Sequence, residues 1–262
     1  MSSGTAAILV VSALVAAVQD PAAEPVIDRL TLHYDLSVSG IGMAEAEVAV
    51  QIGSDGYAID AHVETYGAAS LLEDLTVNAS TAGLTPGGAV APERFETRNL
   101  YNGDPRHAEV RWSGEWATVA ALAPTLEEEE RTPIPDEARL SAFDPLSAML
   151  SFATGAPSQG QCAGTAKVFD GRRSYVLTLD PGEDAGRLES LEIGGTAVTA
   201  LKCRISSLRT GGKSPDGWLS DTSDSEAAEI WFWRDPAGRA VPVRLEADAP
   251  VGYAVAQLSR LP

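Results

Sequence analysis

Alternating apolar and polar residues between positions 30 and 63 constrain the fold of this chain more than any other feature. Three alternating segments occur there, separated by glycine-containing turns at 40–42 and 53–56. Successive side chains of a β-strand point to opposite faces, so this period predicts antiparallel strands with one buried and one solvated face. The apolar positions that we expect to face a concave interior include Leu32, Tyr34, Leu36, Val48, Val50 and Ile59.

Turn signals continue the same architecture toward the C-terminus. Asn102-Gly103 and Asp170-Gly171 are strong hairpin signals, because both residues accept positive φ, and Gly194-Gly195 and 235–238 lie between further alternating segments. The sequence therefore predicts a mainly β fold: a highly curved antiparallel sheet, or an open β-barrel, of about a dozen strands. A chain of 262 residues with 44% hydrophobic residues can fill a sizeable core.

One short helix is expected to begin at Asp144. Aspartate is a favoured N-cap, and Pro145 suits the first helical position, where its missing N–H costs nothing. Leu146, Met149, Leu150 and Phe152 then form one apolar stripe, and 155–157 ends the helix.

The N-terminal segment predicts export. Residues 6–18 are apolar but too short to span a bilayer, and small residues at 15–17 suit signal-peptidase cleavage. No Lys or Arg precedes this segment, so a short hydrophobic anchor is the alternative. We expect a signal peptide at 1–17, a leader at 18–29 and a single β domain at 30–262, with two halves joined near 127–143. After cleavage we expect a periplasmic protein without a membrane span.

The net charge of −18 argues against several partners. Binding to nucleic acid or to anionic lipid needs a basic surface, which this composition does not offer. Solubility through self-repulsion explains the charge, and a basic partner or a divalent cation is the alternative. The acidic run 127–130 is expected to be a solvated loop.

Two cysteines, Cys162 and Cys203, lie in the same half of the chain. An even count in an exported chain predicts a disulfide, and two unrelated free thiols are the alternative. A bridge over a loop of this size stabilises the fold by about 4 kcal/mol in the chain-entropy model.

No motif for catalysis, metal binding or nucleotide binding is present. The chain lacks a Gly-x-Ser-x-Gly elbow, HExxH, CxxC, EF-hand spacing and a P-loop. His33 and His62 fall on the polar face of the predicted strands, where they could approach each other, although two exposed histidines are the simpler interpretation. We therefore predict no catalytic residue, no metal ligand and no cofactor.

Two local groups of residues have more than one interpretation. Arg94, Arg98, Arg106 and Arg111 cluster around one predicted hairpin in an otherwise acidic chain. They are candidates for contact with an anion or lipid headgroup, and cross-strand pairing with neighbouring carboxylates is the alternative. The run 231–233 (Trp-Phe-Trp) would place bulky rings on both faces of a strand, either under a covering loop or along a concave ligand face.

Several short motifs, in this order, resemble an exported bacterial family called domain of unknown function 3108. They are Leu32-x-Tyr34 leading to Gly40-Ile41-Gly42, Asp144-Pro145-Leu146-Ser147, and the segments 168–173, 200–205 and 241–245. The resemblance covers nearly the whole chain after the signal. It implies a periplasmic antiparallel β protein, similar in outline to the LolA/LolB-type lipoprotein carriers. It implies no activity and no catalytic residue.

Two functions follow from these expectations. The first is a non-enzymatic carrier that holds a hydrophobic ligand, a lipid or acyl chain, on the concave face of the sheet. The second is a structural protein of the cell envelope that binds a partner through a sheet edge or loop, with 127–130 and 210–225 as candidates. An empty apolar interior would favour the carrier, and a packed interior would favour the envelope protein.

Overall fold

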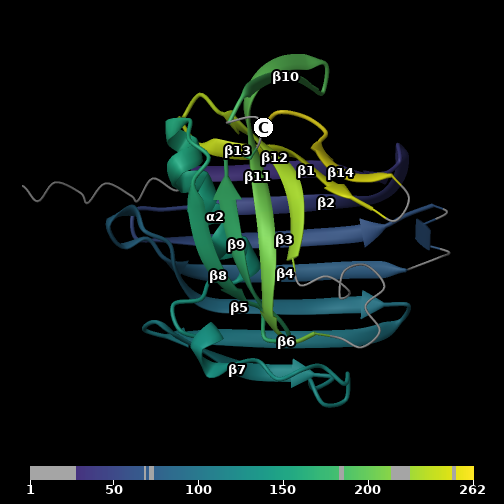
Figure 1. Cartoon of the computed structure of the whole chain (residues 1–262), viewed down its shortest axis with the longest axis vertical. Helices are drawn as coiled ribbons and strands as arrows, with labels where there is room; N and C mark the ends of the chain where they lie inside the picture. The colour runs from purple at the N-terminus through teal and green to yellow at the C-terminus, as the bar shows by residue number, and fades with distance from the viewer. Residues whose placement is uncertain (1–27, 68, 71–73, 183–185, 214–224, 250–251) are drawn as a thin grey trace, which may run out of the picture.

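Fourteen antiparallel strands form one continuous, strongly curved sheet (Figure 1). The computed structural model describes residues 28–262 apart from 68, 71–73, 183–185, 214–224 and 250–251, so the predicted signal peptide and most of the leader lie outside the described residues. The strands are β1 Asp28–Val38, β2 Ile41–Ile52, β3 Gly56–Thr65, β4 Leu75–Leu84, β5 Ala91–Tyr101, β6 Asp104–Ser113, β7 Trp116–Ala123, β8 Gly164–Phe169, β9 Ser174–Asp180, β10 Leu188–Ile193, β11 Thr196–Gly211, β12 Ser225–Arg234, β13 Ala240–Asp248 and β14 Tyr253–Leu258. The predicted mainly β fold is confirmed.

The sheet runs without a break through both halves of the chain. Its order is β7-β6-β5-β4-β3-β2-β1-β14-β13-β12-β11-β9-β8, and β10 pairs with β11 beside this path. The pairing of β1 with β14 joins the N-terminal meander to the C-terminal one. The sheet curls over itself, so that β8, β9, β11 and β12 cross in front of β2–β7 (Figure 1).

The segment between the two halves bridges the seam between the edge strands β7 and β8 at two points. Leu140 forms an antiparallel bridge with Trp116 of β7, and Phe143 forms a parallel bridge with Val168 of β8. The Phe143 amide donates to the Lys167 carbonyl at 2.8 Å, and the Phe169 amide donates to the Phe143 carbonyl at 2.8 Å. Over the described strands the sheet is thus nearly a closed barrel, left unsealed at this seam.

Helix α2 (Pro145–Thr154) begins where the sequence predicts and lies against β4, β8 and β13. The Asp144 side chain accepts hydrogen bonds from the amides of Leu146 and Ser147. The described residues also include three 3-10 segments, η1 Pro86–Gly88, η2 Asp136–Ala138 and η3 Ala156–Gln159. No helix of the described residues is long and apolar enough to cross a membrane.

The bulky run in β12 packs on both faces of the sheet. Phe232 joins a core cluster with Phe152 of α2, whereas Trp231 packs on the other face with Ile193 of β10. A register shift between Trp231 and Phe232 accompanies this arrangement. The hairpin of β10 and β11 therefore covers the face of the sheet that bears Trp231. This arrangement agrees with the interpretation that the bulky run packs beneath a covering segment.

Candidate ligand-binding cavity

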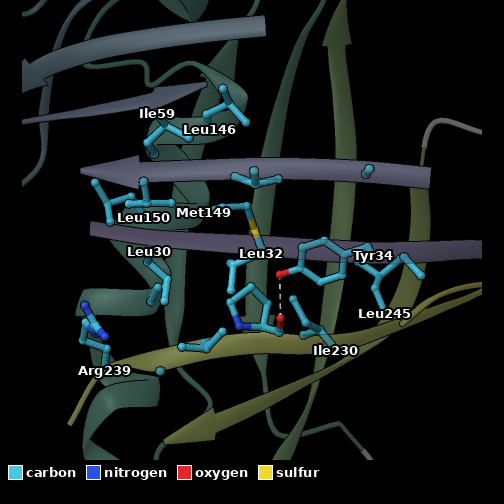
Figure 2. A pocket seen from close by; sticks show the side chains of 18 of the residues that line it. Leu30, Leu32, Tyr34, Ile59, Leu146, Met149, Leu150, Ile230, Arg239 and Leu245 are labelled. Atoms are coloured by element: carbon cyan, nitrogen blue, oxygen red, sulfur yellow. Dashed lines mark hydrogen bonds between the residues drawn. The ribbon is translucent and has the colours of Figure 1, made fainter. Parts of the chain in front are cut away.

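An apolar cavity of about 310 Å³ lies inside the curve of the sheet. Strands β1–β3 form one wall, α2 forms the second, and β12–β14 form the third (Figure 2). The lining residues are Leu30, Leu32, Tyr34, Leu36, Ala46, Val48, Val50, Ile52, Ile59, Leu146, Met149, Leu150, Ala153, Thr154, Ile230, Arg239, Ala240, Val241, Pro242, Arg244, Leu245 and Ala256. Nearly all are apolar, so the cavity suits a hydrocarbon.

All six residues expected on the concave face line this cavity. The alternation in β1, β2 and β3 directs them inward, and the register pairs Leu32 with Val48 and Val50 with Ile59. Leu36, Val48 and Val50 face the interior yet stay only half-buried, because the space in front of them is not filled by side chains. The lining residues Leu30 and Leu36 lie six positions apart on β1, which corresponds to about 20 Å of strand.

Helix α2 divides the interior into a filled part and a hollow part. Ala148 and Phe152 face the core cluster that contains Val168 and Leu179. Leu146, Met149 and Leu150 face the cavity instead, and Figure 2 shows Leu146 beside Ile59 of β3. Three residues of the predicted apolar stripe therefore form a wall of the hollow space, whereas the inclusion of Phe152 was wrong, because its ring packs into the core cluster on the other side of the helix.

Tyr34 connects two walls of the cavity. Its hydroxyl donates to the Pro242 carbonyl at 2.7 Å, linking β1 to β13 (Figure 2). Burial raises the pKa of Tyr34 above its ordinary value, so the phenol remains neutral at physiological pH. The aromatic ring then serves as apolar wall, and the one polar atom is already satisfied.

Two arginines contribute to the lining, and carboxylates neutralise both. Arg239 forms ion pairs with Asp235 and Asp28. Arg244 donates to the Gln257 amide oxygen at 3.0 Å and to Glu246 at 2.7 Å. The cavity wall therefore presents no unpaired positive charge among the described residues.

A buried polar network anchors the start of α2 to the sheet. The Asp144 carboxylate accepts hydrogen bonds from the Ser147 hydroxyl and, at 2.9 Å, from Thr81 of β4. The Tyr57 hydroxyl lies 2.6 Å from the Ser147 hydroxyl. Burial raises the pKa of Asp144 and of Tyr57. Sequence reasoning identified the cap at Asp144 but missed these partners on β3 and β4.

The four candidate anion-contact arginines lie on β5 and β6, and each is paired with a carboxylate. Arg94 bridges Glu96 and Glu109, and Arg98 pairs with Glu96. Arg111 contacts Glu109 at 2.9 Å. Arg106 approaches Glu129 at 3.4 Å and stacks over the Tyr101 ring. The structure thus shows carboxylate pairing, the alternative interpretation, rather than an open basic site.

The acidic run 127–130 is not simply a solvated loop, so that expectation is wrong for Glu129. Its carboxylate lies 2.8 Å from Arg131 and 2.7 Å from Arg172, and all three side chains are largely buried. Arg172 also donates to the carbonyls of His107, Ala123 and Pro124. The run therefore helps to tie the β8–β9 turn to β6 and β7.

Cys162 and Cys203 form a disulfide, with their Cα atoms 5.5 Å apart. Both sulfur-bearing residues are buried in the core cluster beside Phe152 and Leu179. The bridge links the segment before β8 to β11. It stabilises the filled part of the interior and does not line the cavity.

All three histidines lie in one cross-strand row on the outer face. The register pairs His33 with Glu47, Glu47 with His62, and Arg98 with His107, and Asn78 continues the row between His62 and Arg98. Glu96, His107 and Glu109 bring ligand atoms within reach of one cation. Arg94, Arg98 and Arg111 already pair with these carboxylates, so the cluster is explained as an ion-pair network.

The profile of the family described as "Protein of unknown function (DUF3108)" matches residues 31–259. The chain belongs to the DUF3108 family. The matched region includes every strand from β2 to β14 and thus all three walls of the cavity. No curated protein sequence matches the chain.

A solved structure supports the DUF3108 fold independently. The chain is similar to a β-barrel-like protein of domain of unknown function DUF1849 from Brucella abortus, with a TM-score of 0.52 and 11% identity. The similarity covers 90% of this chain and 96% of the other. At this identity the likeness establishes the architecture and says nothing of a ligand.

Proposed function

We propose that this DUF3108 protein is a non-enzymatic carrier that binds one acyl chain of a lipid or fatty acid. The observation that carries the proposal is the apolar cavity of about 310 Å³. An apolar cavity of about 150 Å³ is already enough to hold benzene, and ligand pockets start at about 300 Å³. The space therefore suits one hydrocarbon chain.

The length of the cavity wall supports a chain-like ligand over a compact one. The wall extends about 20 Å along β1, whereas one leaflet of a bilayer has a hydrocarbon thickness of about 15 Å. A full acyl chain can therefore lie along the row from Leu30 to Leu36. The polar headgroup would remain outside, because the lining has no free polar partner for it.

The chemistry of the lining supports binding without catalysis. Tyr34 is hydrogen-bonded to Pro242, and Arg239 and Arg244 are held by carboxylates. At the start of α2, the Asp144 carboxylate accepts hydrogen bonds from the amide and the hydroxyl of Ser147. General acid–base or nucleophilic catalysis needs a group aimed at the ligand, and these groups are directed at one another.

The proposed location is the periplasm. The apolar N-terminal segment 6–18 and the Cys162–Cys203 disulfide support export, because disulfides persist in oxidising compartments. The alternative role as an envelope structural protein draws less support. An apolar interior that side chains leave hollow has no use in a purely structural sheet.

Native mass spectrometry of the protein purified from the envelope fraction of its native host tests the proposal. We expect a population with one additional mass in the range of a fatty acid or lysolipid, lost on collisional activation. Protein that carries no lipid mass after mild purification, and takes up none from added palmitate, would contradict the proposal.

A further inference from the structure

Strand β14 is too short to accompany its neighbours β1 and β13 along their whole length. Its six residues end at Leu258, which pairs with Tyr34 of β1, and its pairing with β13 begins only at Arg244. Residues 28–33 of β1 and 240–243 of β13 therefore extend past the end of β14, and no described strand lies between them. We call the interval between these two stretches the β1–β13 gap.

The chain turns away from the sheet after β14 and does not fill this gap. The Ser259 amide and hydroxyl still donate to the His33 carbonyl, at 2.8 and 3.0 Å. Arg260 then lies against the β10–β11 turn, where a Cβ on Gly194 would come within 3.1 Å of the Arg260 Cα. Among the described residues no backbone hydrogen bond crosses the β1–β13 gap.

The β1–β13 gap borders the apolar cavity. Leu30 and Leu32 on one side of the gap, and Val241 and Pro242 on the other, belong to the cavity lining. The neighbouring strands of the lining are otherwise joined by ladders: β1 with β2, β2 with β3, β12 with β13, and β14 with both β13 and β1. The gap is therefore a stretch of the strand wall that can part without breaking a ladder.

Apolar side chains close the gap in place of backbone hydrogen bonds. Leu32 and Val241 are buried in one core cluster, and Leu30 packs against it. Leu261, from the C-terminal segment, packs against the same cluster. Because apolar contacts have no preferred direction, a hydrocarbon chain that passes between these side chains replaces the contacts that it displaces.

Two polar contacts cross the β1–β13 gap, one at each end. The Tyr34 hydroxyl donates to the Pro242 carbonyl at 2.7 Å where β14 stops, and Arg239 forms an ion pair with Asp28 at the other end. Figure 2 shows Arg239 and Tyr34 at separate places along the row of lining residues. Arg239 also pairs with the buried Asp235, which holds the arginine in place when the exposed Asp28 moves away. The two contacts thus act as latches.

We propose that the β1–β13 gap is a lateral gate through which the acyl chain enters and leaves the cavity, held shut by the Tyr34–Pro242 and Asp28–Arg239 contacts. The inference rests on the proposed carrier function. The gap runs along the first part of the row from Leu30 to Leu36, so a chain can enter sideways. A latch that is closed with and without ligand raises the barrier to entry and exit equally, so it sets the rate of exchange and not the affinity.

Stopped-flow exchange of a fluorescent fatty acid with the full chain tests the gate. Tyr34→Phe removes one latch, and association and dissociation should both accelerate roughly fivefold, the factor that corresponds to one ordinary hydrogen bond. Asp28→Asn should accelerate both rates by less, because its ion pair is partly exposed. The affinity, which is the ratio of the two rates, should remain unchanged in both variants.

Two control variants remove comparable interactions far from the gap. The Trp112 indole donates to the Ala142 carbonyl at 2.7 Å, so Trp112→Phe loses a similar bond in the other half of the sheet. Asp136→Asn alters an exposed carboxylate that lies 3.8 Å from Arg139. Neither control should change the rates. Equal acceleration by Trp112→Phe and Tyr34→Phe would show that general loosening of the fold limits exchange, and this result would overturn the gate.

The remaining outcomes separate the gate from the carrier function. Saturable binding with the same exchange rates in the wild type, Tyr34→Phe and Asp28→Asn overturns the gate alone. Faster dissociation of Tyr34→Phe with unchanged association also overturns it, because the hydroxyl would then contact the ligand. Absence of binding in every protein contradicts the carrier function itself, and the gate fails with it.

Discussion

The hydroxyl of Tyr34 donates to the carbonyl of Pro242 across the cavity, at 2.7 Å. Tyr34 belongs to β1 and Pro242 to β13, so the bond spans β14, which lies between them in the sheet. Tyr34 and Pro242 both line the hollow. The hydrogen bond therefore fixes the distance between two walls of the cavity. Because the hydroxyl and the carbonyl satisfy each other, neither presents an unpaired polar atom to the interior.

Replacement of Tyr34 by Phe should weaken the fold without closing the cavity. The Pro242 carbonyl loses its partner, which costs about 1 kcal/mol of unfolding free energy. The ring that forms the wall remains, so acyl binding should be nearly unchanged. Chemical denaturation and probe displacement measure the two effects. Tyr253→Phe, at an exposed position, is the control and should change neither; a large loss of binding in Tyr34→Phe would show that the hydroxyl contacts the ligand.

Alkaline pH should destabilise the protein through its buried tyrosines. Burial raises the pKa of Tyr34, Tyr57 and Tyr175 above the ordinary value of 10.0. Above pH 10 the unfolded chain releases these protons while the folded chain retains them. Stability is therefore full below pH 10 and falls as pH rises, by up to about 1.4 kcal/mol per pH unit for each tyrosine.

Urea unfolding between pH 8 and pH 11 checks this dependence. The Tyr175→Phe variant should show a shallower decline above pH 10 than the wild type, because one titrating group is removed. An identical slope in the two proteins would contradict the role of this tyrosine.

The network at Asp144 predicts opposite outcomes for two substitutions. Asp144→Ala removes the helix cap and leaves Thr81 and Ser147 without an acceptor, so it should cost about 2–4 kcal/mol. Asp144→Asn keeps an oxygen for the amides of α2 and removes the buried charge. The raised pKa means that the ionised form is disfavoured in the folded state, so stability due to this group falls as pH rises through that pKa.

At pH 7 we therefore expect Asp144→Asn to be at least as stable as the wild type, as measured by thermal unfolding. A loss as large as that of Asp144→Ala would mean that the carboxylate charge itself is required.

Arg172 should control the opening of the seam between β7 and β8. Replacement by Ala removes its bonds to three carbonyls and leaves the largely buried Glu129 with one fewer partner, which should cost about 3–5 kcal/mol. Hydrogen exchange should accelerate in β7 and in the β8–β9 turn more than in β1 and β2. Arg111→Ala on the exposed outer face is the control and should cost at most about 1 kcal/mol. Uniform acceleration across the sheet would contradict a local role.

Local pattern was enough to predict the strands and the direction of the cavity residues. Period-2 alternation places Leu32 and Val48 on one face without any knowledge of tertiary structure. Asp144-Pro145 likewise predicted the start of α2, because an N-cap is a short-range interaction that the local sequence specifies. The turn at Gly114, which separates β6 from β7, is less visible in the sequence because Trp112 and Trp116 favour strand on both sides.

Features that depend on distant residues were not predictable in this way. The hollow exists because small residues such as Ala46 and Ala256 face it. These two residues are 210 positions apart in sequence, and no local pattern predicts whether side chains from such distant strands together fill the interior. Thr81 reaches Asp144 over 63 positions, and Glu129 meets Arg172 over 43. The acidic run therefore resembled a solvated loop until the partners of Glu129 were located.

Filling the cavity tests the central claim most directly. Ala46→Phe places a ring inside the hollow, whereas Ala49→Phe places the same ring on the outer face of the same strand. Displacement of a fluorescent fatty acid should show saturable binding at one site in the wild type and in Ala49→Phe. Ala46→Phe should lose that binding while its unfolding free energy stays near or above the wild-type value, because the ring occupies empty space. Equal binding by both variants, or no binding by the wild type, would contradict the account.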